Sequence, residues 1–392
     1  MDSHFPYDKY VTGKHYIGRR TETQVFANLV SQGENVVIYE PPKTGKKSLV
    51  QQAFYNLKPT GQRFVPVQLS LLDVRSLRDL ALRLAAAALQ SAGSGPEDYA
   101  RTAQELLAGS HLVFDPARFN ACGEIVSLTW ELDDDDLRAA FLLPYRIGVQ
   151  AGVRRIVVLD EFQNVMLTED GERACRILEG VFKTLPPDLA PGACYVFLGS
   201  QVNAMHEIFG VRRWFWRRVE RLHLPTIETR EIMDHVNRGF LTSGKVIDRE
   251  LLQGVCRLFK DNIWYINHFS AICDSLTRGY VLEPTLTEAL GTLLSVHEPR
   301  FVATMNDLTT FQVSLLRAIL DGHTRFSSAE VIRRYALNSS ANVRRLKDAL
   351  CKKEIVTFDK DDNPVLLDPL FEYWVRKYYF KMTTECNNAS QC

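Results

Sequence analysis

A glycine and a lysine, Gly45 and Lys46, follow the short apolar run Val36–Tyr39 and precede a stretch with helical spacing. A strand, a glycine-containing turn and a helix start form the arrangement in which backbone N–H groups and a lysine ammonium hold phosphate. The full pattern is a glycine, four residues of any type, glycine, lysine, and serine or threonine. Glu40 stands at the first glycine and Lys47 at the hydroxyl position. The sequence therefore predicts a phosphate-binding loop (P-loop) with two departures.

These departures alter the chemistry that the loop could support. Glu40 replaces a residue that permits a tight turn, and its carboxylate would repel phosphate. Lys47 cannot bind Mg²⁺, but its ammonium could neutralise phosphate charge directly, without a metal. Ser48 follows one residue later, about 100° around the helix, and is at most a weak metal ligand. We predict reduced Mg²⁺ dependence and slow or absent hydrolysis; the alternative is a strand, turn and helix with an incidental Gly-Lys pair.

Two further strand ends carry polar residues that suit phosphate chemistry. Asp160 and Glu161 close the run Arg154–Leu159, which is the Walker B pattern. In that pattern the aspartate holds Mg²⁺ through water and the glutamate polarises the attacking water. Ser200 and Gln201 follow another apolar run, and we expect its strand to lie between the first two and to bring Ser200 or Gln201 near the γ-phosphate. The alternative is a surface strand that happens to end in acids.

The elements that must position these residues form an α/β pattern. Continuous apolar runs alternate with helical segments, which predicts a parallel sheet covered by helices on both faces. The acid run Asp133–Asp136 interrupts the pattern, and we interpret it as the cap of a helix over 137–150 rather than as a metal site. The expected strands are 36–39, 64–69, 155–159, 194–198 and 221–224.

The rest of the chain divides into further parts. Residues 1–225 are assigned to the α/β core, and 226–304 to a helical lid without strands. Residues 305–381 show three helices and a hairpin around Asp361–Pro364, which together indicate a winged helix-turn-helix. Residues 382–392 are polar, and we expect them to be disordered.

Composition limits the class of protein. The net charge is zero, and 46% of residues are hydrophobic and 24% charged, as in ordinary globular domains. Eight cysteines without metal-like spacing are typical of reduced thiols, so we expect a cytoplasmic protein. No apolar run approaches the length that spans a bilayer, and we expect no membrane partner.

Taken together, these motifs resemble those of the prokaryotic and archaeal-type P-loop ATPases, relatives of the AAA+ and STAND classes with a C-terminal winged helix. Asp160–Asn164 is similar to the D-E-F-Q-N signature of that family, and Asp368–Phe371 to a D-P-L-F motif in its C-terminal unit. The segment 17–22 resembles a box beside the adenine, and Phe215–Arg218 resembles an F-Y-x-R segment. The resemblance implies ATP or ADP as the ligand, and ring-forming relatives make a homo-oligomer an open expectation.

The candidate site residues follow from the motifs and the resemblance. The expected catalytic set is Glu161, Asp160, Ser200 and Arg218, and Asp160 and, weakly, Ser48 are the metal candidates. The expected nucleotide-binding residues are Ile17, Gly18, Arg19, Pro42, Lys43, Thr44, Gly45, Lys46, Lys47, Ser48 and Leu49.

The function that fits these expectations is a nucleotide-dependent switch whose winged helix engages double-stranded DNA or a protein. Arg344, Arg345 and Lys347 lie on the expected recognition helix and could contact DNA. Two alternatives remain open: an inactive ATPase fold used as a scaffold, and a DNA-binding regulator without a nucleotide cycle.

Overall fold

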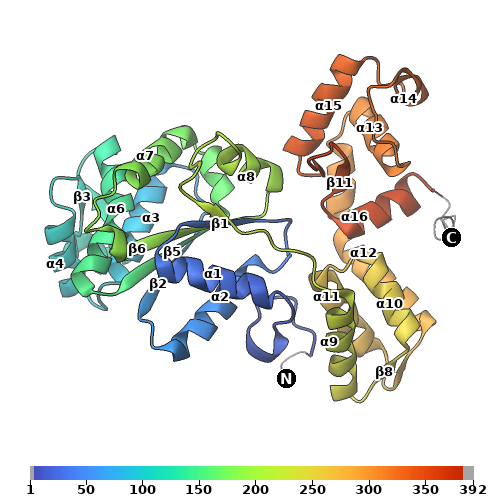
Figure 1. The fold of residues 1–392 in the computed structure, drawn as a ribbon, viewed down its shortest axis with the longest axis horizontal. Coiled ribbons are helices and arrows are strands. Elements are labelled where there is room, and N and C mark those ends of the chain that lie inside the picture. Colours follow the sequence, from blue (N-terminus) through green and yellow to red (C-terminus); the bar gives the residue numbers. More distant parts are fainter. Residues whose placement is uncertain (1–3, 383–392) are drawn as a thin grey trace. The chain divides into compact units, whose positions relative to one another are not determined.

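The computed structural model describes residues 4–382 of the 392-residue chain. It contains two compact units (Figure 1). One runs from Arg19 to Leu224, and the other combines the N-terminal segment through Gly18 with the chain from Pro225 onward. The chain therefore passes between the units after Gly18 and again after Leu224. Among the described residues, no helix is both long and apolar enough to cross a bilayer.

A five-stranded parallel sheet forms the centre of the first unit, as the alternating pattern predicts. Its central strands are buried along nearly their whole length because helices cover both faces, which explains their continuous apolar runs. The last strand pairs over only two residues, fewer than expected. In sheet order the strands are β2 (Phe64–Ser70), β5 (Arg154–Asp160), β6 (Ala193–Gly199), β1 (Val36–Tyr39) and β7 (Glu220–Arg221).

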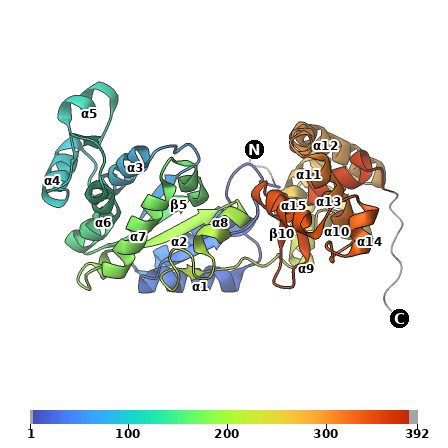
Figure 2. The same ribbon diagram turned by 90° about the horizontal axis from the view of Figure 1, so that it is seen from above.

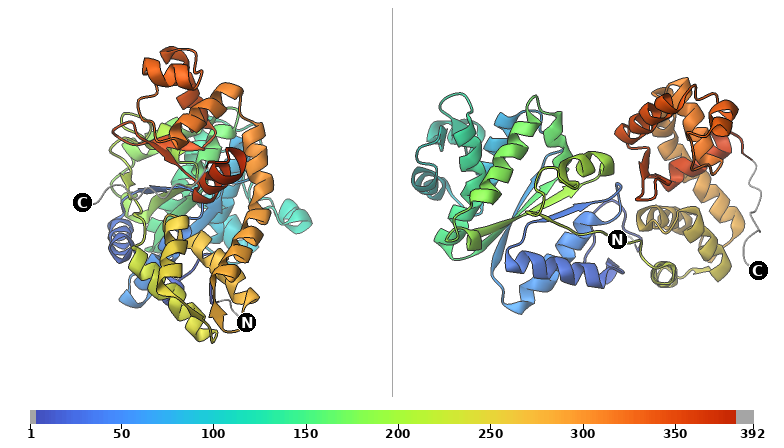
Figure 3. Two further views of the ribbon diagram at one scale, coloured as in Figure 1. Left: turned by 90° about the vertical axis from the view of Figure 1, so that its right-hand side faces the viewer. Right: turned by 45° about the horizontal axis from the view of Figure 1, so that its top comes forward.

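Two groups of helices cover this sheet, one on each face (Figure 3). One group is α1 (Arg20–Gln32) and α2 (Lys46–Leu57), which pack against each other. On the other face α6 (Asp134–Ala151) packs against both α3 (Leu77–Gln90) and α7 (Gly171–Thr184). Helix α8 (Val202–Phe209) follows β6. This layering leaves the carboxyl ends of β1, β5 and β6 side by side at one edge.

An excursion between α3 and α6 projects from the first unit (Figure 2). It consists of α4 (Pro96–Leu106), β3 (Leu112–Val113), α5 (Pro116–Cys122) and β4 (Ser127–Leu128). The acid run that follows begins α6 with a reciprocal capping box between Asp133 and Asp136. The Asp136 carboxylate also accepts the His111 N–H at 2.6 Å. The acid run therefore caps α6, as predicted.

The second unit begins with the helical lid and continues into the winged helix. The lid contains α9 (Thr229–Thr242), α10 (Arg249–Leu258), α11 (Ile263–Leu276) and α12 (Glu283–Asn306). The expectation of a lid without strands is wrong, because β8 (Val246–Ile247) and β9 (Tyr280–Val281) pair in parallel. Strands of two residues are too short to leave a periodic signal in the sequence.

The winged helix has the predicted order of elements. It comprises α13 (Thr310–Leu320), α14 (Ala329–Arg334), α15 (Ser340–Lys352), the wing strands β10 (Val356–Phe358) and β11 (Pro364–Leu366), and α16 (Pro369–Trp374). Ser339 caps α15 by accepting the Asn342 N–H. Asp368 caps α16 and also accepts hydrogen bonds from Tyr265 of α11 and Arg300 of α12. The aspartate of the D-P-L-F motif therefore joins the lid to the winged helix.

The N-terminal segment packs within the second unit, whereas the sequence prediction placed it in the region 1–225. The Phe5 ring lies 4.8 Å from that of Phe240, and the Asn267 amide donates to the Pro6 carbonyl. The residues in each of these contacts are far apart in the sequence, so no local pattern predicts the contacts. Of the predicted disordered tail at 382–392, all but Met382 lies outside the described residues.

Candidate functional site

The P-loop connects β1 to α2 at the carboxyl edge of the sheet. Gly45 has the left-handed backbone conformation, with φ of 94°, and it caps the N-terminus of α2. The buried Lys46 ammonium donates to the carbonyl oxygens of Glu40 at 2.7 Å and of Pro41 at 2.9 Å. Thr44 closes the same turn by donating its hydroxyl to Pro41. The loop is thus folded around the lysine that the motif predicts.

Burial lowers the pKa of Lys46 to about 8. The carboxylates of Glu161, Glu40 and Asp160 oppose this shift, and Arg19 adds to it. An anion that approaches this lysine would stabilise its charged form, because the surrounding groups compensate that charge only in part. This electrostatic setting suits a phosphate ligand.

Glu40, at the first glycine position, does not leave its carboxylate free. Its Oε1 accepts the Leu224 N–H at 3.1 Å and lies 2.7 Å from Nδ1 of His223. The side chain is only 12% exposed. The expectation of a free carboxylate that repels phosphate is therefore corrected: this carboxylate is bound to the chain that follows β7.

Lys47 occupies the hydroxyl position of the motif and forms an ion pair with the Walker B aspartate. Its Nζ lies 2.6 Å from Oδ2 of Asp160, and the two side chains are 57% and 10% exposed. Burial raises the pKa of Asp160, and Lys47 counteracts that rise. With an ammonium at this carboxylate and no hydroxyl at position 47, the residues present do not fit a Mg²⁺ site of the usual P-loop kind.

Glu161 is held in place by its neighbours on two strand ends. Its Oε2 accepts hydrogen bonds from the Ser200 hydroxyl at 2.5 Å and from the Gln163 amide at 2.6 Å. The residue adopts a left-handed conformation with φ of 56°, directly after β5. Asn164 donates to the carbonyls of Leu71 and Leu72 and fixes the turn that follows. The structure therefore brings Ser200 to Glu161, because β6 lies between β1 and β5.

Other predicted nucleotide-binding residues occupy different settings. The Arg19 guanidinium donates to the Thr44 carbonyl in the P-loop. Pro42 and Lys43 are exposed at the loop tip. Of the two residues on the first turn of α2 beyond Lys47, Ser48 is half-buried and Leu49 lies in the core. Ile17 and Gly18 precede Arg19 and belong to the second unit.

The structure does not bring Arg218 to this group. Its backbone carbonyl accepts a hydrogen bond from Asn35, the residue that precedes β1. The P-loop follows the opposite, carboxyl end of the same strand. The exposed Arg218 side chain thus belongs to a segment at the far end of β1 from Lys46.

His223 and the Leu224 amide, which hold the Glu40 carboxylate, were not singled out from the sequence. Their contact with Glu40 spans more than 180 positions, so no local spacing reveals it. The one available signal was their place in the expected fifth strand, 221–224, which the structure shortens to Glu220–Arg221. In this sheet that strand neighbours β1, so its end adjoins the P-loop.

On the winged helix, the three predicted DNA contacts are not equivalent. Arg344 and Arg345 are exposed on α15, and neither forms an ion pair with any described residue. Lys347 instead pairs with Asp362 in the wing, and its Nζ lies 4.0 Å from the centre of the Phe358 ring. Lys347 therefore contributes to holding the wing against the helix.

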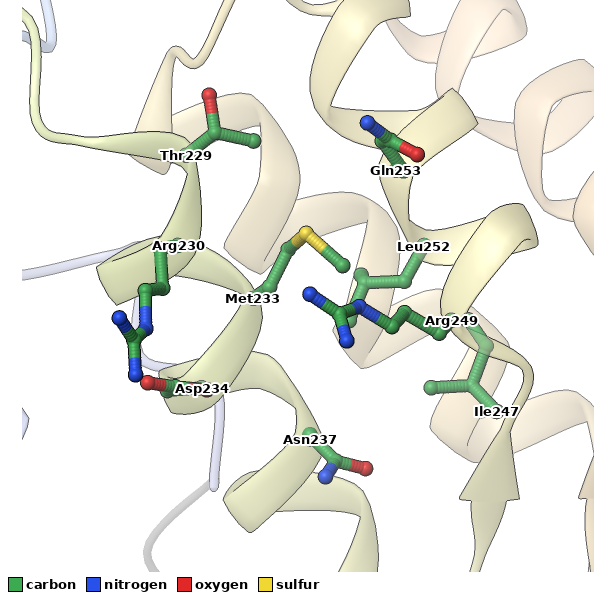
Figure 4. A pocket seen from close by; sticks show the side chains of 9 residues that line it. All are labelled: Thr229, Arg230, Met233, Asp234, Asn237, Ile247, Arg249, Leu252 and Gln253. Atoms are coloured by element: carbon green, nitrogen blue, oxygen red, sulfur yellow. The ribbon is translucent and has the colours of Figure 1, made fainter.

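A separate cavity of about 560 Å³ lies in the lid, between α9 and α10 (Figure 4). The Arg249 side chain extends into it beside Met233, and Arg249 makes no ion pair within residues 4–382. None of the predicted nucleotide or DNA residues line this cavity. The lining residues are Thr229, Arg230, Met233, Asp234, Asn237, Ile247, Arg249, Leu252 and Gln253.

Comparisons with known proteins agree with this architecture. A family model described as "Probable winged helix domain" matches residues 299–377. No curated protein matches the sequence. Among solved structures, the chain is similar to a Walker-type ATPase of Pyrococcus abyssi, with 16% identity, a TM-score of 0.64, and 95% of this chain and 99% of that chain covered.

It is also similar to the ORC2 protein of Aeropyrum pernix, solved as ADPNP–ADP complexes. Here the identity is 14%, the TM-score is 0.58, and 93% of each chain is covered. Together with the strand order, these likenesses show the fold: a P-loop ATPase core, a helical lid and a C-terminal winged helix. The fold implied by the family resemblance is therefore confirmed.

Proposed function

We propose that this protein is a nucleotide-binding switch whose P-loop holds ATP or ADP without a required Mg²⁺ ion. The observation that carries the proposal is the ion pair between Lys47 and Asp160, at 2.6 Å. It places a lysine ammonium of the protein at the carboxylate that would otherwise serve a metal. The ammonium of Lys47 could then neutralise phosphate charge in place of Mg²⁺.

The residues that would hold the nucleotide are those of the P-loop and the start of α2. Lys46 would supply a buried ammonium, and the first N–H groups of α2 would supply backbone donors for phosphate oxygens. Lys47 would add a second ammonium within the same turn. The ORC2 structure was solved with ADPNP and ADP, and its similar fold supports the assignment of a nucleotide to this loop.

Hydrolysis, by contrast, is expected to be slow or absent. Glu161 retains the position of the residue that polarises water, and Ser200 and Gln163 orient its carboxylate. Phosphoryl transfer, however, depends largely on metal ions that bridge the β- and γ-phosphates. With Lys47 on Asp160, that contribution is lost. The site therefore favours binding over turnover.

Calorimetric titration of ATP and ADP into the full chain, with Mg²⁺ and with EDTA, tests this proposal. We expect both nucleotides to bind, with affinities that differ by less than about threefold between the two conditions, since Lys47 already supplies the positive charge. Binding that requires Mg²⁺ would refute the metal-free site. An absence of binding under both conditions would favour the alternative of an inactive scaffold.

For the winged helix, we infer that duplex DNA is the partner, through Arg344 and Arg345. The observation behind this choice is that both guanidiniums are exposed and lack ion pairs within the described residues, whereas Lys347 is engaged by the wing.

Exchanging both arginines for alanine should weaken duplex binding and flatten its salt dependence. Lys347→Ala is the matched control. It should lower the stability of the winged helix more than it changes the affinity for duplex DNA. Fluorescence anisotropy at low and moderate salt measures both effects, and an absence of duplex binding at low salt would point to a protein partner.

A further inference from the structure

The P-loop contacts both segments in which the chain passes between the two compact units. Arg19, the first residue after one passage, donates its guanidinium to the Thr44 carbonyl. Leu224, the last residue before the other passage, donates its backbone N–H to the Glu40 carboxylate. The loop that would hold phosphate is thus bonded to one connecting segment at Glu40 and to the other at Thr44.

Glu40 makes two kinds of contact at once. Its backbone carbonyl accepts from the Lys46 ammonium at 2.7 Å, and its side chain reaches Leu224 and His223. The glycine that the motif normally carries could make the first contact but not the second. The residue that weakens the sequence match therefore creates a physical link between the phosphate-binding lysine and the chain leaving this unit.

We propose that Glu40 is a positioning residue that couples occupancy of the P-loop to the connecting segment His223–Leu224. The inference rests on the proposed nucleotide function. It describes how nucleotide binding at the P-loop would be transmitted to another segment of the chain. An anion at Lys46 competes with the Glu40 and Pro41 carbonyls for the same ammonium. Loss of that bond leaves the Glu40 backbone held by its N–H donation to the Gly199 carbonyl, and with one restraint fewer the carboxylate on the same residue holds Leu224 less firmly. By linkage, release of Leu224 favours nucleotide binding to the same degree.

Amide hydrogen exchange on the full chain, with resolution at Leu224, tests the link. Leu222 provides an internal reference, because its N–H donates to the Val37 carbonyl of β1 and not to Glu40. Without nucleotide, Glu40→Ala should raise the exchange rate of Leu224 by about tenfold or more and leave Leu222 unchanged. Glu40→Gln, which keeps a side-chain oxygen as acceptor, should preserve most of the protection. Equal exchange of Leu224 in wild type and Glu40→Ala would overturn the link.

The coupling is tested by adding ATP at a concentration that saturates binding. In the wild type, Leu224 should exchange at least about threefold faster with ATP than without it. In Glu40→Ala this difference should vanish, even though the variant still binds ATP. Glu34→Ala, which removes an exposed carboxylate before β1, is the matched control and should respond to ATP as the wild type does. Unchanged or slower exchange at Leu224 in the ATP-bound wild type would overturn the coupling.

Calorimetry on the same samples separates the two possible failures. A wild-type protein that binds ATP without a change at Leu224 contradicts the coupling alone. A protein that binds neither ATP nor ADP contradicts the proposed function. In that case the nucleotide-free comparison of wild type and Glu40→Ala still decides whether Glu40 holds the connecting segment.

Discussion

The two halves of the candidate nucleotide site differ in how closely they follow their motifs. On the β5 and β6 side, Asp160, Glu161 and Ser200 stand where the patterns place them, and Glu161 is bonded to its neighbours. On the β1 side, the loop departs at Glu40 and Lys47, yet both residues have specific partners. Both substituted side chains are therefore part of the loop's own packing, one through a backbone N–H and the other through an ion pair.

The partners of the two departures also differ in kind. Glu40 is nearly buried and accepts a backbone N–H, so its contact fixes the position of the chain. Lys47 is more than half exposed, and ion pairs of exposed groups contribute little to stability. The Lys47–Asp160 pair matters for where it places charge. One substitution therefore acts on geometry and the other on electrostatics.

The largest effect should come from the loop side, at the lysine that both halves surround. Lys46→Ala should reduce ATP affinity by about 100-fold or more, because it removes the buried ammonium that would meet the phosphates. Calorimetry measures the loss. A small change in affinity would mean that the phosphates bind elsewhere.

The second prediction reverses the departure at position 47. Lys47→Thr restores a hydroxyl and releases Asp160, so Mg²⁺ should now raise ATP affinity by about tenfold and ATP turnover by about 100-fold. Phosphate release assays with and without Mg²⁺ measure the gain. Adding Glu161→Gln should abolish the new turnover and leave binding intact. If Lys47→Thr stays independent of Mg²⁺, the β5 and β6 side is not a competent catalytic half.

A third prediction concerns pH and follows from the pKa of Lys46, about 8. ATP affinity should fall by up to about tenfold per pH unit above that value, because the free protein loses the charge that binds phosphate.

The effect of pH on stability has the opposite direction. The folded-state pKa lies below the ordinary value of 10.5, so the unfolded chain binds more protons between these values. The contribution of Lys46 to the free energy of unfolding should therefore rise with pH across that window. Urea titrations of the wild type and of Lys46→Met at several pH values measure this contribution as the difference between the two free energies.

The smallest effect is expected on the β5 and β6 side. Ser200→Ala removes one of two donors to Glu161 and leaves Gln163 in place. It should lower the free energy of unfolding by about 1 kcal/mol and change ATP affinity by less than about threefold. Denaturant titration and calorimetry provide the two values. A large loss of affinity would show that Ser200 contacts the nucleotide itself.

Sequence patterns predicted most of the fold because its signals are local. Buried strands produce continuous apolar runs, and the cap at Asp133 and the cap at Ser339 depend on residues only three positions away. Of the strand order, only the place of the Ser200 strand between the other two site strands was predicted, and the sheet confirms it. The pairing of β8 with β9 was missed because each strand is two residues long.

The site was predictable in its residue types but not in its contacts. The sequence indicated that Lys47 could stand in for a metal, yet only the fold shows that its ammonium meets Asp160. The contact of Glu40 with Leu224 joins a loop to a strand end far along the chain, and Glu40 alone suggested repulsion instead. Such contacts are set by the order of strands in the sheet, which no short motif encodes.

Helix α12 gives the second unit a mechanical property. Its 24 residues make it about 36 Å long, and Asp368 ties the start of α16 to both α11 and α12. Lid and winged helix would then turn together as a lever arm. A rotation of about 10° at one end of a rod of this length moves the other end by about 6 Å, roughly one helical turn. Small angular changes in the lid would thus become displacements of several ångströms in the winged helix.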